Sequence, residues 1–396
     1  MPGWEIIDQK EKNKILEIFN LSNGVMFAHG FNERRKNIFR VRTFEKKICA
    51  KLNVKYCVAT TSGTMAQYIA MKAMGVKKDD EVITQAFTFV ATVEAILALG
   101  AKPVITDIDN TLNMCPEDLK KKITSKTKLI IPVPMLGNPC DMKKILAISK
   151  KKKIPVMEDA CESLGSKLNG SFVGTKADVG IFSLDFAKTI TTGEGGLIVS
   201  NNNKIMKFCR EFHDHGHQNN TKKFRGEDTR KIWGLNLRMT ELQAAVGIAQ
   251  LSKLDYIVRK NKKNKDFLKN KIINNDYFEF RKINSKDELA DTLIMILKKK
   301  KHAAQLAKIY RKNNINTKNL PDAINWHFAG NWEHIFKNVS KYKNNYKFHW
   351  NKSRDLLERS VAIPIFVNDS KKELNFIAKL TNNFFLNLLS NKKSLN

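Results

Sequence analysis

One lysine, Lys188, follows a predicted strand and precedes a glycine-rich turn. The strand runs from Val179 to Ser183, and the turn is the run Gly193-Glu194-Gly195-Gly196. A lysine in a loop at the edge of a sheet is partly removed from water, which lowers its pKa and lets its amine form a Schiff base with an aldehyde. The alternative is a surface lysine, the usual role in a chain with 70 Lys and Arg residues. Lys188 is thus a candidate nucleophile whose role depends on its neighbours.

An acidic pair, Glu158 and Asp159, ends another apolar strand. A carboxylate at a buried strand end requires a partner, because an unpaired charge out of water is costly. A protonated ring nitrogen, a helix cap or a metal ion would each serve. The pair by itself leaves these three partners open.

The run Thr60-Thr61-Ser62-Gly63-Thr64 joins a predicted strand to a predicted helix. Small residues there leave backbone N–H groups free at the positive end of the helix, which favours an anion such as phosphate. A Ser or Thr cap without any ligand is the alternative. The run therefore indicates a candidate anion site.

The elements that must position these residues alternate between strand and helix, which predicts an α/β fold with a mostly parallel sheet between helices. Ligands on such sheets bind at the carboxyl ends of the strands. The predicted strands are Tyr56 to Thr60, Glu81 to Thr84, Pro103 to Thr106, Lys128 to Val133, Pro155 to Glu158, Val179 to Ser183 and Gly196 to Ser200. The predicted helices are Gly63 to Ala73, Ala91 to Leu99, Pro116 to Ile123, Met142 to Lys151 and Asn202 to Phe212.

A long helix is expected from Thr240, a plausible cap, through Leu254, and the pattern changes after it to charged, helix-rich segments. We place a domain boundary there. Residues 1–255 are expected to form a large α/β domain with an N-terminal arm, and residues 256–396 a smaller α+β domain.

The composition narrows the class of protein. The net charge of +31 could indicate nucleic-acid binding, but the lysines are spread through ordinary helical segments, so we expect a solvated surface and no nucleic-acid partner. The apolar run Phe87 to Ala101 is interrupted by Glu94 and too short to span a bilayer, so no membrane partner is expected. The six cysteines show no metal-ligand spacing and fit a reducing cytoplasm.

The stretch from Thr60 to Asp255 resembles the fold-type I, pyridoxal phosphate-dependent sugar aminotransferases of the DegT/StrS type. The resemblance implies that fold, with a mixed sheet and a smaller C-terminal α+β domain. Its motifs occur in the family's order: TSGT at 61–64, FTFVAT at 87–92, EDA at 158–160, FS at 182–183, KTITTGEGG at 188–196 and GLNLRMTELQAA at 234–245.

The resemblance assigns cofactor contacts residue by residue. It implies that the cofactor phosphate lies on Gly63, Thr64 and Ser183, and that the ring of Phe89 stacks on the pyridine. It pairs the ring nitrogen with Asp159, which keeps that nitrogen protonated.

Three further residues take roles by the same resemblance. Glu162 falls near the ring hydroxyl, where the family often has Gln or Glu. Lys188 is implied to bind the cofactor covalently and then to carry the proton between donor and cofactor. Asn236 matches a residue that the family supplies to the phosphate from the neighbouring subunit, so the implied active unit is a homodimer with shared sites.

The implied reaction moves an amino group from glutamate to a keto- or aldehydo-sugar. Some relatives with His at the lysine position are dehydratases, and Lys188 argues against that activity. Local motifs are similar to those of the 8-amino-3,8-dideoxy-manno-octulosonate (Kdo8N) transaminases of lipopolysaccharide biosynthesis. They include the N-terminal Met1-Pro2-Gly3-Trp4-Glu5, the His213–His217 run and Asn325-Trp326-His327. That similarity implies a carboxylated eight-carbon sugar as the acceptor.

Five residues are expected to contact the substrate. The histidines of the 213–217 run could bind metal, but contacts to sugar hydroxyl or carboxylate groups are favoured, and no metal is expected. The Trp/His pair could form a sugar platform or pack within the small domain, and the arginine could hold a carboxylate or brace the dimer. These residues are His215, His217, Arg238, Trp326 and His327.

Two other functions remain open at this point. One is an aminotransferase of a nucleotide-linked 4-keto-6-deoxy sugar, which has the same chemistry and a different acceptor. The other is a non-catalytic regulator that binds pyridoxal phosphate on the same fold. The presence of both Lys188 and Asp159 argues against the regulator.

Overall fold

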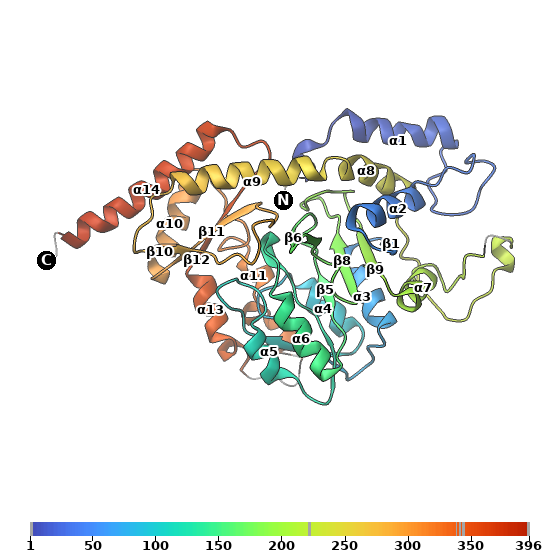
Figure 1. The fold of residues 1–396 in the computed structure, drawn as a ribbon, viewed down its shortest axis with the longest axis horizontal. Coiled ribbons are helices and arrows are strands. Elements are labelled where there is room, and N and C mark those ends of the chain that lie inside the picture. Colours follow the sequence, from blue (N-terminus) through green and yellow to red (C-terminus); the bar gives the residue numbers. More distant parts are fainter. Residues whose placement is uncertain (1–2, 221–222, 338, 340–341, 343–344, 394–396) are drawn as a thin grey trace.

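Two sheets joined edge to edge form the centre of the larger part of the molecule (Figure 1). The computed structural model describes residues 3–220, 223–337, 339, 342 and 345–393. One sheet has the strand order β1-β9-β8-β5 and the other the order β3-β2-β4, and a parallel bridge between Ile130 and Val156 joins them. The strands are β1 (Tyr56–Thr60), β2 (Glu81–Gln85), β3 (Lys102–Thr106), β4 (Thr127–Ile130), β5 (Met157–Asp159), β8 (Val179–Ser183) and β9 (Gly196–Ser200).

The joined sheet is mostly parallel, as the sequence predicts. Strand β9 runs antiparallel to both β1 and β8, whereas β5 pairs with β8, and β2 with β3 and β4, in parallel. Strands β1, β5 and β8 therefore point the same way, and their carboxyl ends meet along one edge of the sheet.

Apolar residues cover both faces of this sheet. Along β8 and β9, Ile181 and Ile198 belong to one buried cluster, and Phe182 and Leu197 to the other, because successive side chains point to opposite faces. Helix α3 (Gly63–Ala73) packs on the first face, and α2 (Arg40–Leu52) and α8 (Glu241–Leu251) pack on the second. A sheet covered on both faces needs such continuous apolar strands.

The remaining helices surround the sheet or belong to the C-terminal part. The first group is α1 (Gln9–Ser22), α4 (Ala91–Ala98), α5 (Pro116–Lys122), α6 (Met142–Lys152) and α7 (Asn203–Phe212). The second is α9 (Leu254–Lys271), α10 (Lys300–Lys312), α11 (Ile324–His327), α12 (Glu333–Phe336), α13 (Asn351–Glu358) and α14 (Lys371–Lys393). None of the helices in the described ranges is long and apolar enough to cross a membrane.

A separate, antiparallel sheet lies beyond residue 255. It has the order β10-β11-β12, and its apolar residues form a core with α9, α10 and α14. The C-terminal part also contributes Phe328, Trp332 and Trp350 to the core of the large sheet. The division at residue 255 stays a prediction. The strands are β10 (Phe278–Phe280), β11 (Thr292–Leu297) and β12 (Ser360–Pro364), and a separate hairpin consists of β6 (Lys167–Leu168) and β7 (Ser171–Phe172).

The structure corrects two of the predicted elements. The strand expected to reach Val133 ends at Ile130, because the prolines at 132 and 134 carry no N–H for the ladder. The helix expected from Thr240 to Leu254 is α8, which ends earlier, at Leu251; α9 begins at Leu254 after a break at Ser252 and Lys253. The Ser252 hydroxyl donates to the Ala249 carbonyl oxygen, a local bond that competes with the continuing helix. Thr240 caps α8 as expected.

Candidate active site

The candidate site lies at the edge where the carboxyl ends of β1, β5 and β8 meet. Asp159 is the last residue of β5 and Ser183 the last of β8, while Gly63 begins α3 shortly after β1. Lys188 lies in the loop between β8 and β9. Three sequence motifs far apart in the chain are thus brought to one place.

Gly63 allows the start of α3 to pack against Ser183. A Cβ atom at Gly63 would lie 2.9 Å from Ser183 Cβ and 3.1 Å from Cys161 Sγ, so a side chain there would force the two segments apart. The Ser62 hydroxyl caps the helix by accepting a hydrogen bond from Met65 N at 3.2 Å. The half-buried Thr64 follows on the first turn. This helix start beside a serine hydroxyl suits a phosphate group.

Asp159 is buried and held by two donors. The Thr92 hydroxyl donates to Asp159 Oδ2 at 2.7 Å, and the backbone N–H of Cys161 donates to Oδ1 at 3.3 Å. Burial raises the pKa of Asp159, and these donors and Lys188 offset only part of that increase. A cation facing this carboxylate would favour its ionised form.

Lys188 faces a second buried carboxylate, Glu162. The distance from Lys188 Nζ to Glu162 Oε1 is 3.7 Å, and the Lys188 side chain is 15% exposed. Burial lowers the pKa of Lys188, but the negative groups around it, Glu162 foremost, outweigh burial and raise that pKa above its ordinary value. The expectation of a lowered pKa is therefore wrong for the protein without its cofactor.

Glu162 shows the reciprocal effect. Burial raises its pKa, yet the charges of Lys188 and His327 and of the more distant Lys318 outweigh burial, so the pKa of Glu162 lies below its usual value. Its other oxygen accepts a hydrogen bond from the backbone N–H of Leu136 at 3.2 Å. Glu162 is thus held as a carboxylate next to the lysine.

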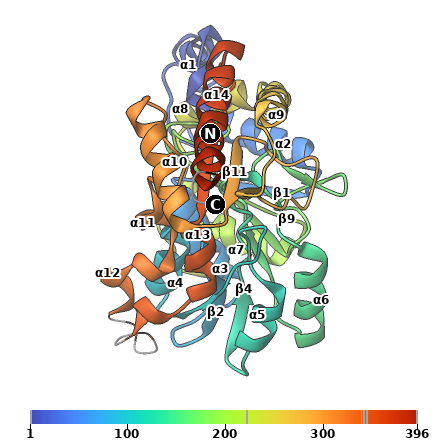
Figure 2. The ribbon, with the colours of Figure 1, turned by 90° about the vertical axis from the view of Figure 1, so that its left-hand side faces the viewer.

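A segment of the C-terminal part carries Trp326 and His327 to this site. The backbone N–H groups of Thr88 and Val90 donate to the carbonyl oxygens of His327 and Trp326 at 2.9 and 3.0 Å. Figure 2 shows α11, which contains both residues, on the same side as α4. The two segments therefore form one wall of the site.

Phe89 forms an aromatic surface on that wall. Its ring is 40% exposed, and the Trp326 ring lies nearly parallel to it, with the centroids 6.3 Å apart. Trp326 is 61% exposed, whereas His327 is buried, with its Nε2 3.8 Å from Glu162 Oε1. Of the two roles considered for this pair, the exposed Trp326 ring fits a surface for a ligand, and the His327 ring is packed between Phe89 and Glu162.

Arg238 is engaged by a buried carboxylate of its own chain, that of Asp214. Arg238 Nη1 donates to Asp214 Oδ1 at 2.5 Å, and Arg225 binds the same carboxylate at 2.6 Å. His29 Nε2 lies 3.5 Å from it. In the single chain, Arg238 therefore binds Asp214. The expected contacts of Arg238 with a ligand carboxylate or with a second subunit stay predictions.

The other two expected histidines, His215 and His217, lie on the segment between α7 and α8. His217 is buried, with Nδ1 3.3 Å from Asp228 Oδ2 and Nε2 3.3 Å from Arg230 Nη2. His215 is exposed and has a positive φ of 53°. In the described part of the chain, no group of three or more His, Cys, Asp or Glu side chains could hold a metal ion.

Asn236 is exposed on the segment that leads to Arg238. The next residue, Leu237, accepts a hydrogen bond from Thr61 N at 3.1 Å, so this segment runs beside the loop that precedes α3. Its assigned contact with a phosphate across a dimer interface stays a prediction.

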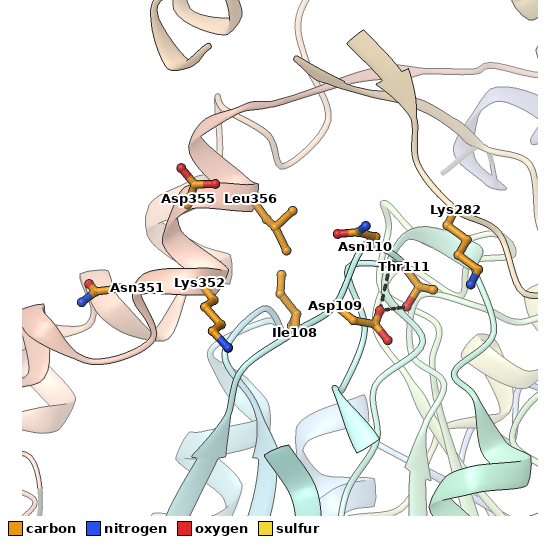
Figure 3. A pocket seen from close by; sticks show the side chains of 9 residues that line it. All are labelled: Ile108, Asp109, Asn110, Thr111, Lys282, Asn351, Lys352, Asp355 and Leu356. Atoms are coloured by element: carbon orange, nitrogen blue, oxygen red, sulfur yellow. Dashed lines mark hydrogen bonds between the residues drawn. The ribbon is translucent and has the colours of Figure 1, made fainter. Parts of the chain in front are cut away.

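A cavity of about 720 Å³ lies elsewhere, between the loop after β3 and helix α13 (Figure 3). Figure 3 shows Asp109 turned toward Thr111, whose hydroxyl donates to it at 2.5 Å, and Lys352 on the opposite wall. None of the lining residues belongs to the Lys188 cluster.

Sequence reasoning missed Thr92 and Asp214. Thr92 is the last residue of the FTFVAT motif, and a hydroxyl in an apolar helix start was the available signal. Asp214 lies inside the histidine run, and an acidic residue between histidines was the available signal.

The fold is that of the fold-type I proteins. Residues 35–380 match the DegT/DnrJ/EryC1/StrS aminotransferase family. The chain belongs to this family, which confirms the resemblance seen in the motifs.

Known proteins support this placement. The chain is 38% identical over 237 residues to GDP-perosamine synthase of Escherichia coli O157:H7, which covers 59% of this chain and 63% of that protein. The match thus spans somewhat less than two thirds of that relative's length.

Solved structures share the fold over nearly the whole chain. The aminotransferase PseC of Helicobacter pylori, involved in the biosynthesis of pseudoaminic acid, has a TM-score of 0.81 at 24% identity and covers 96% of this chain and 97% of its own. NtdA of Bacillus subtilis, with bound cofactor PMP, has a TM-score of 0.82 at 24% identity and covers 97% and 84%. The expected cofactor is therefore of the kind bound in a protein of this fold.

Proposed function

We propose that this protein is a pyridoxal phosphate-dependent sugar aminotransferase. The observation that carries the proposal is the meeting of Lys188, Asp159 and the start of α3 at one edge of the sheet in a chain of this family. When bound, the cofactor supplies an aldehyde that takes up an amino group and a ring that accommodates an electron pair.

The residues present fit that cofactor. Gly63, Thr64 and Ser183 would hold the phosphate, since the tight approach at Gly63 brings the Ser183 side chain to the helix start. Phe89 would pack against one face of the ring with its exposed side. Asp159 would pair with the ring nitrogen, and the Thr92 hydroxyl fixes the carboxylate for that contact.

Lys188 would both attach the cofactor and move the proton. The Lys188 amine would take the α-proton from the amino donor and give a proton to the carbon that then carries the amino group. Glu162, 3.7 Å away, favours the charged amine before the cofactor binds and would lie near the ring hydroxyl afterwards. Glutamate as donor, with 2-oxoglutarate as its product, is part of the proposal.

For the acceptor, the comparisons favour a nucleotide-linked keto-sugar over the eight-carbon sugar acid. The relative at 38% identity is named for a GDP-linked product. The second candidate, the 8-aldehyde of an oxidised Kdo sugar, is supported by the placement of Trp326 and His327 at the site, because these belong to the motifs that resemble Kdo8N transaminases.

The two acceptors separate in one experiment. Protein first converted to its amino-loaded form with glutamate is mixed with a nucleotide-linked 4-keto-6-deoxy sugar or with the 8-oxo sugar acid, and the absorption of the lysine-bound cofactor is followed. We expect that absorption to return with the nucleotide-linked sugar. Recovery with the sugar acid alone would overturn this choice and leave the aminotransferase proposal standing.

We further propose a homodimer with shared sites. Large apolar side chains of the N-terminal segment are exposed in the single chain, among them Leu16, Phe19 and Phe31. Exposed apolar groups gathered on one segment mark an interaction surface. Asn236 would then reach the phosphate of the partner's cofactor.

Mixing two inactive variants tests the sharing of sites. A mixed dimer of Lys188→Ala and Asn236→Ala subunits contains one site with both wild-type residues only if Asn236 acts across the interface. We expect activity to return when the two variants are unfolded together and refolded. No recovery, together with normal exchange of labelled subunits, would show that Asn236 acts within its own chain.

The cysteines support the expected compartment. All six are free, which fits the reducing conditions of the cytoplasm.

A further inference from the structure

The N-terminal residues Gly3–Ile6 contact the loop that carries Lys188. The backbone N–H of Gly3 donates to the carbonyl oxygen of Lys188 itself at 3.0 Å. The Trp4 ring stacks on Phe186, two residues before the lysine, with the centroids 6.2 Å apart and the planes 19° apart. The residues singled out as an unusual N-terminal motif therefore lie directly on the lysine loop.

The contact at Gly3 leaves no room for a side chain. A Cβ atom there would lie 2.8 Å from the Lys188 carbonyl oxygen and 3.0 Å from Ile190 Cα and Thr191 N. All three are backbone atoms, so the loop could not yield by turning a side chain. A glycine is required for this approach.

The other end of the same segment contacts the C-terminal part of the chain. Glu5 Oε2 accepts a hydrogen bond from Asn368 N at 3.2 Å, and the Asn368 side chain donates to the Glu5 carbonyl oxygen at 3.1 Å. Asn368 lies between β12 and α14. The segment thus links the lysine loop to the end of the C-terminal sheet.

Buried charges anchor the segment where it enters α1. Lys253 Nζ donates to the Ile6 carbonyl oxygen at 2.5 Å and to the buried Glu11 at 2.8 Å. Gln250 donates to the same glutamate at 2.9 Å. Lys253 lies at the break between α8 and α9, and α8 packs on the large sheet. The start of α1 is therefore held to the part of the chain that covers this sheet.

From Ile190 onward the lysine loop is fixed by the rest of the chain, because Ile190 is buried in the core and Thr191 N donates to Gln250 Oε1 at 3.3 Å. The part from Asp185 to Lys188 is the one that Gly3 and Trp4 contact. Within the loop, Lys188 N donates to the Asp185 carbonyl oxygen at 3.0 Å, and Thr192 N donates to the Leu184 carbonyl oxygen at 2.9 Å. Both bonds tie the loop to itself. Gly3 and Trp4 hold its outer side.

We propose that Gly3–Glu5 is a positioning strap that holds the main chain of Lys188 and Phe186, so that the lysine amine stays at the site. Its effect on turnover rests on the proposed function, but its effect on the lysine does not. Trp4 and Gly3 act through Lys188 and touch no reacting atom.

The test measures Lys188 directly in cofactor-free, full-length protein carrying any tag at its C-terminus. Acetic anhydride labels exposed amines, and mass spectrometry gives the labelling rate of Lys188 relative to the exposed Lys176. We expect Trp4→Ala to raise this rate about two- to tenfold, the factor that corresponds to losing one aromatic pair. Trp4→Phe should restore most of the wild-type value, and Gly3→Ala should act at least as strongly as Trp4→Ala.

Phe376→Ala is the matched control, because Phe376 is 45% exposed and Trp4 is 44% exposed. Asn368→Ala loosens the strap from its far end and should shift labelling in the same direction even if a strap variant fails to fold.

In the loaded enzyme, Trp4→Ala should lower kcat with the KM for glutamate nearly unchanged. Equal Lys188 labelling in wild type, Trp4→Ala and Asn368→Ala would overturn the strap, whereas absent transamination in wild type would overturn only the proposed function.

Discussion

Replacing Lys188 should abolish amino transfer. In Lys188→Ala no amine remains to attach the cofactor or to carry the α-proton, and a positioned proton carrier alone contributes about 10²- to 10⁴-fold to a rate. We expect kcat to fall by at least this factor, and the absorption of lysine-bound cofactor to be absent. Steady-state assays with glutamate and cofactor spectra check both.

Two further variants separate the chemistry of Lys188 from its charge. Lys188→Arg keeps a cation beside Glu162 but stays protonated and cannot move the proton, so it should be as inactive as the alanine variant. Lys176→Ala, which removes an exposed lysine ahead of β8, should retain wild-type activity. Substantial turnover by Lys188→Arg would show that only the positive charge is needed.

Replacing Asp159 should cause the second-largest loss. Asp159→Asn keeps the shape and can still accept from Thr92, but a neutral amide cannot hold a ring nitrogen in its protonated form. Losing such a preorganised electrostatic contact costs about 10²- to 10³-fold in kcat. The half-reaction with glutamate, followed by absorption, measures the loss.

Thr92→Val distinguishes this account from a general disturbance of the site. It removes the 2.7 Å hydrogen bond to Asp159 but keeps the carboxylate, so its loss of rate should be smaller than that of Asp159→Asn. A Thr92→Val variant as slow as Asp159→Asn, or an Asp159→Asn variant within about twofold of wild type, would contradict the assigned role.

The sequence predicts the sheet well because its strands are short apolar runs between helical periods. Strands β1, β8 and β9 have the predicted bounds, since each is buried and bounded by residues that favour turns. The break between α8 and α9 was missed, because periodicity continues through Ser252 while its hydroxyl and the contacts of Lys253 interrupt the helix.

The sequence predicts the position of a site residue only where that position follows from the strand or helix that carries the residue. Asp159, Ser183 and Gly63 end or begin elements, so their meeting follows from the parallel sheet. The contact between Trp326 and Phe89 joins segments that are far apart in the chain, and no local pattern contains it. The raised pKa of Lys188 likewise depends on Glu162, which only the folded chain brings to it.

The most direct test of the central claim is the reaction of the cofactor-loaded protein with glutamate alone. The aminotransferase proposal predicts that the absorption of lysine-bound cofactor disappears while 2-oxoglutarate forms in an amount equal to the sites. It also predicts that Lys188→Arg shows neither change. Retention of that absorption with glutamate and with every other amino donor, and with no keto acid formed, would contradict the account and favour a protein that binds the cofactor without catalysis.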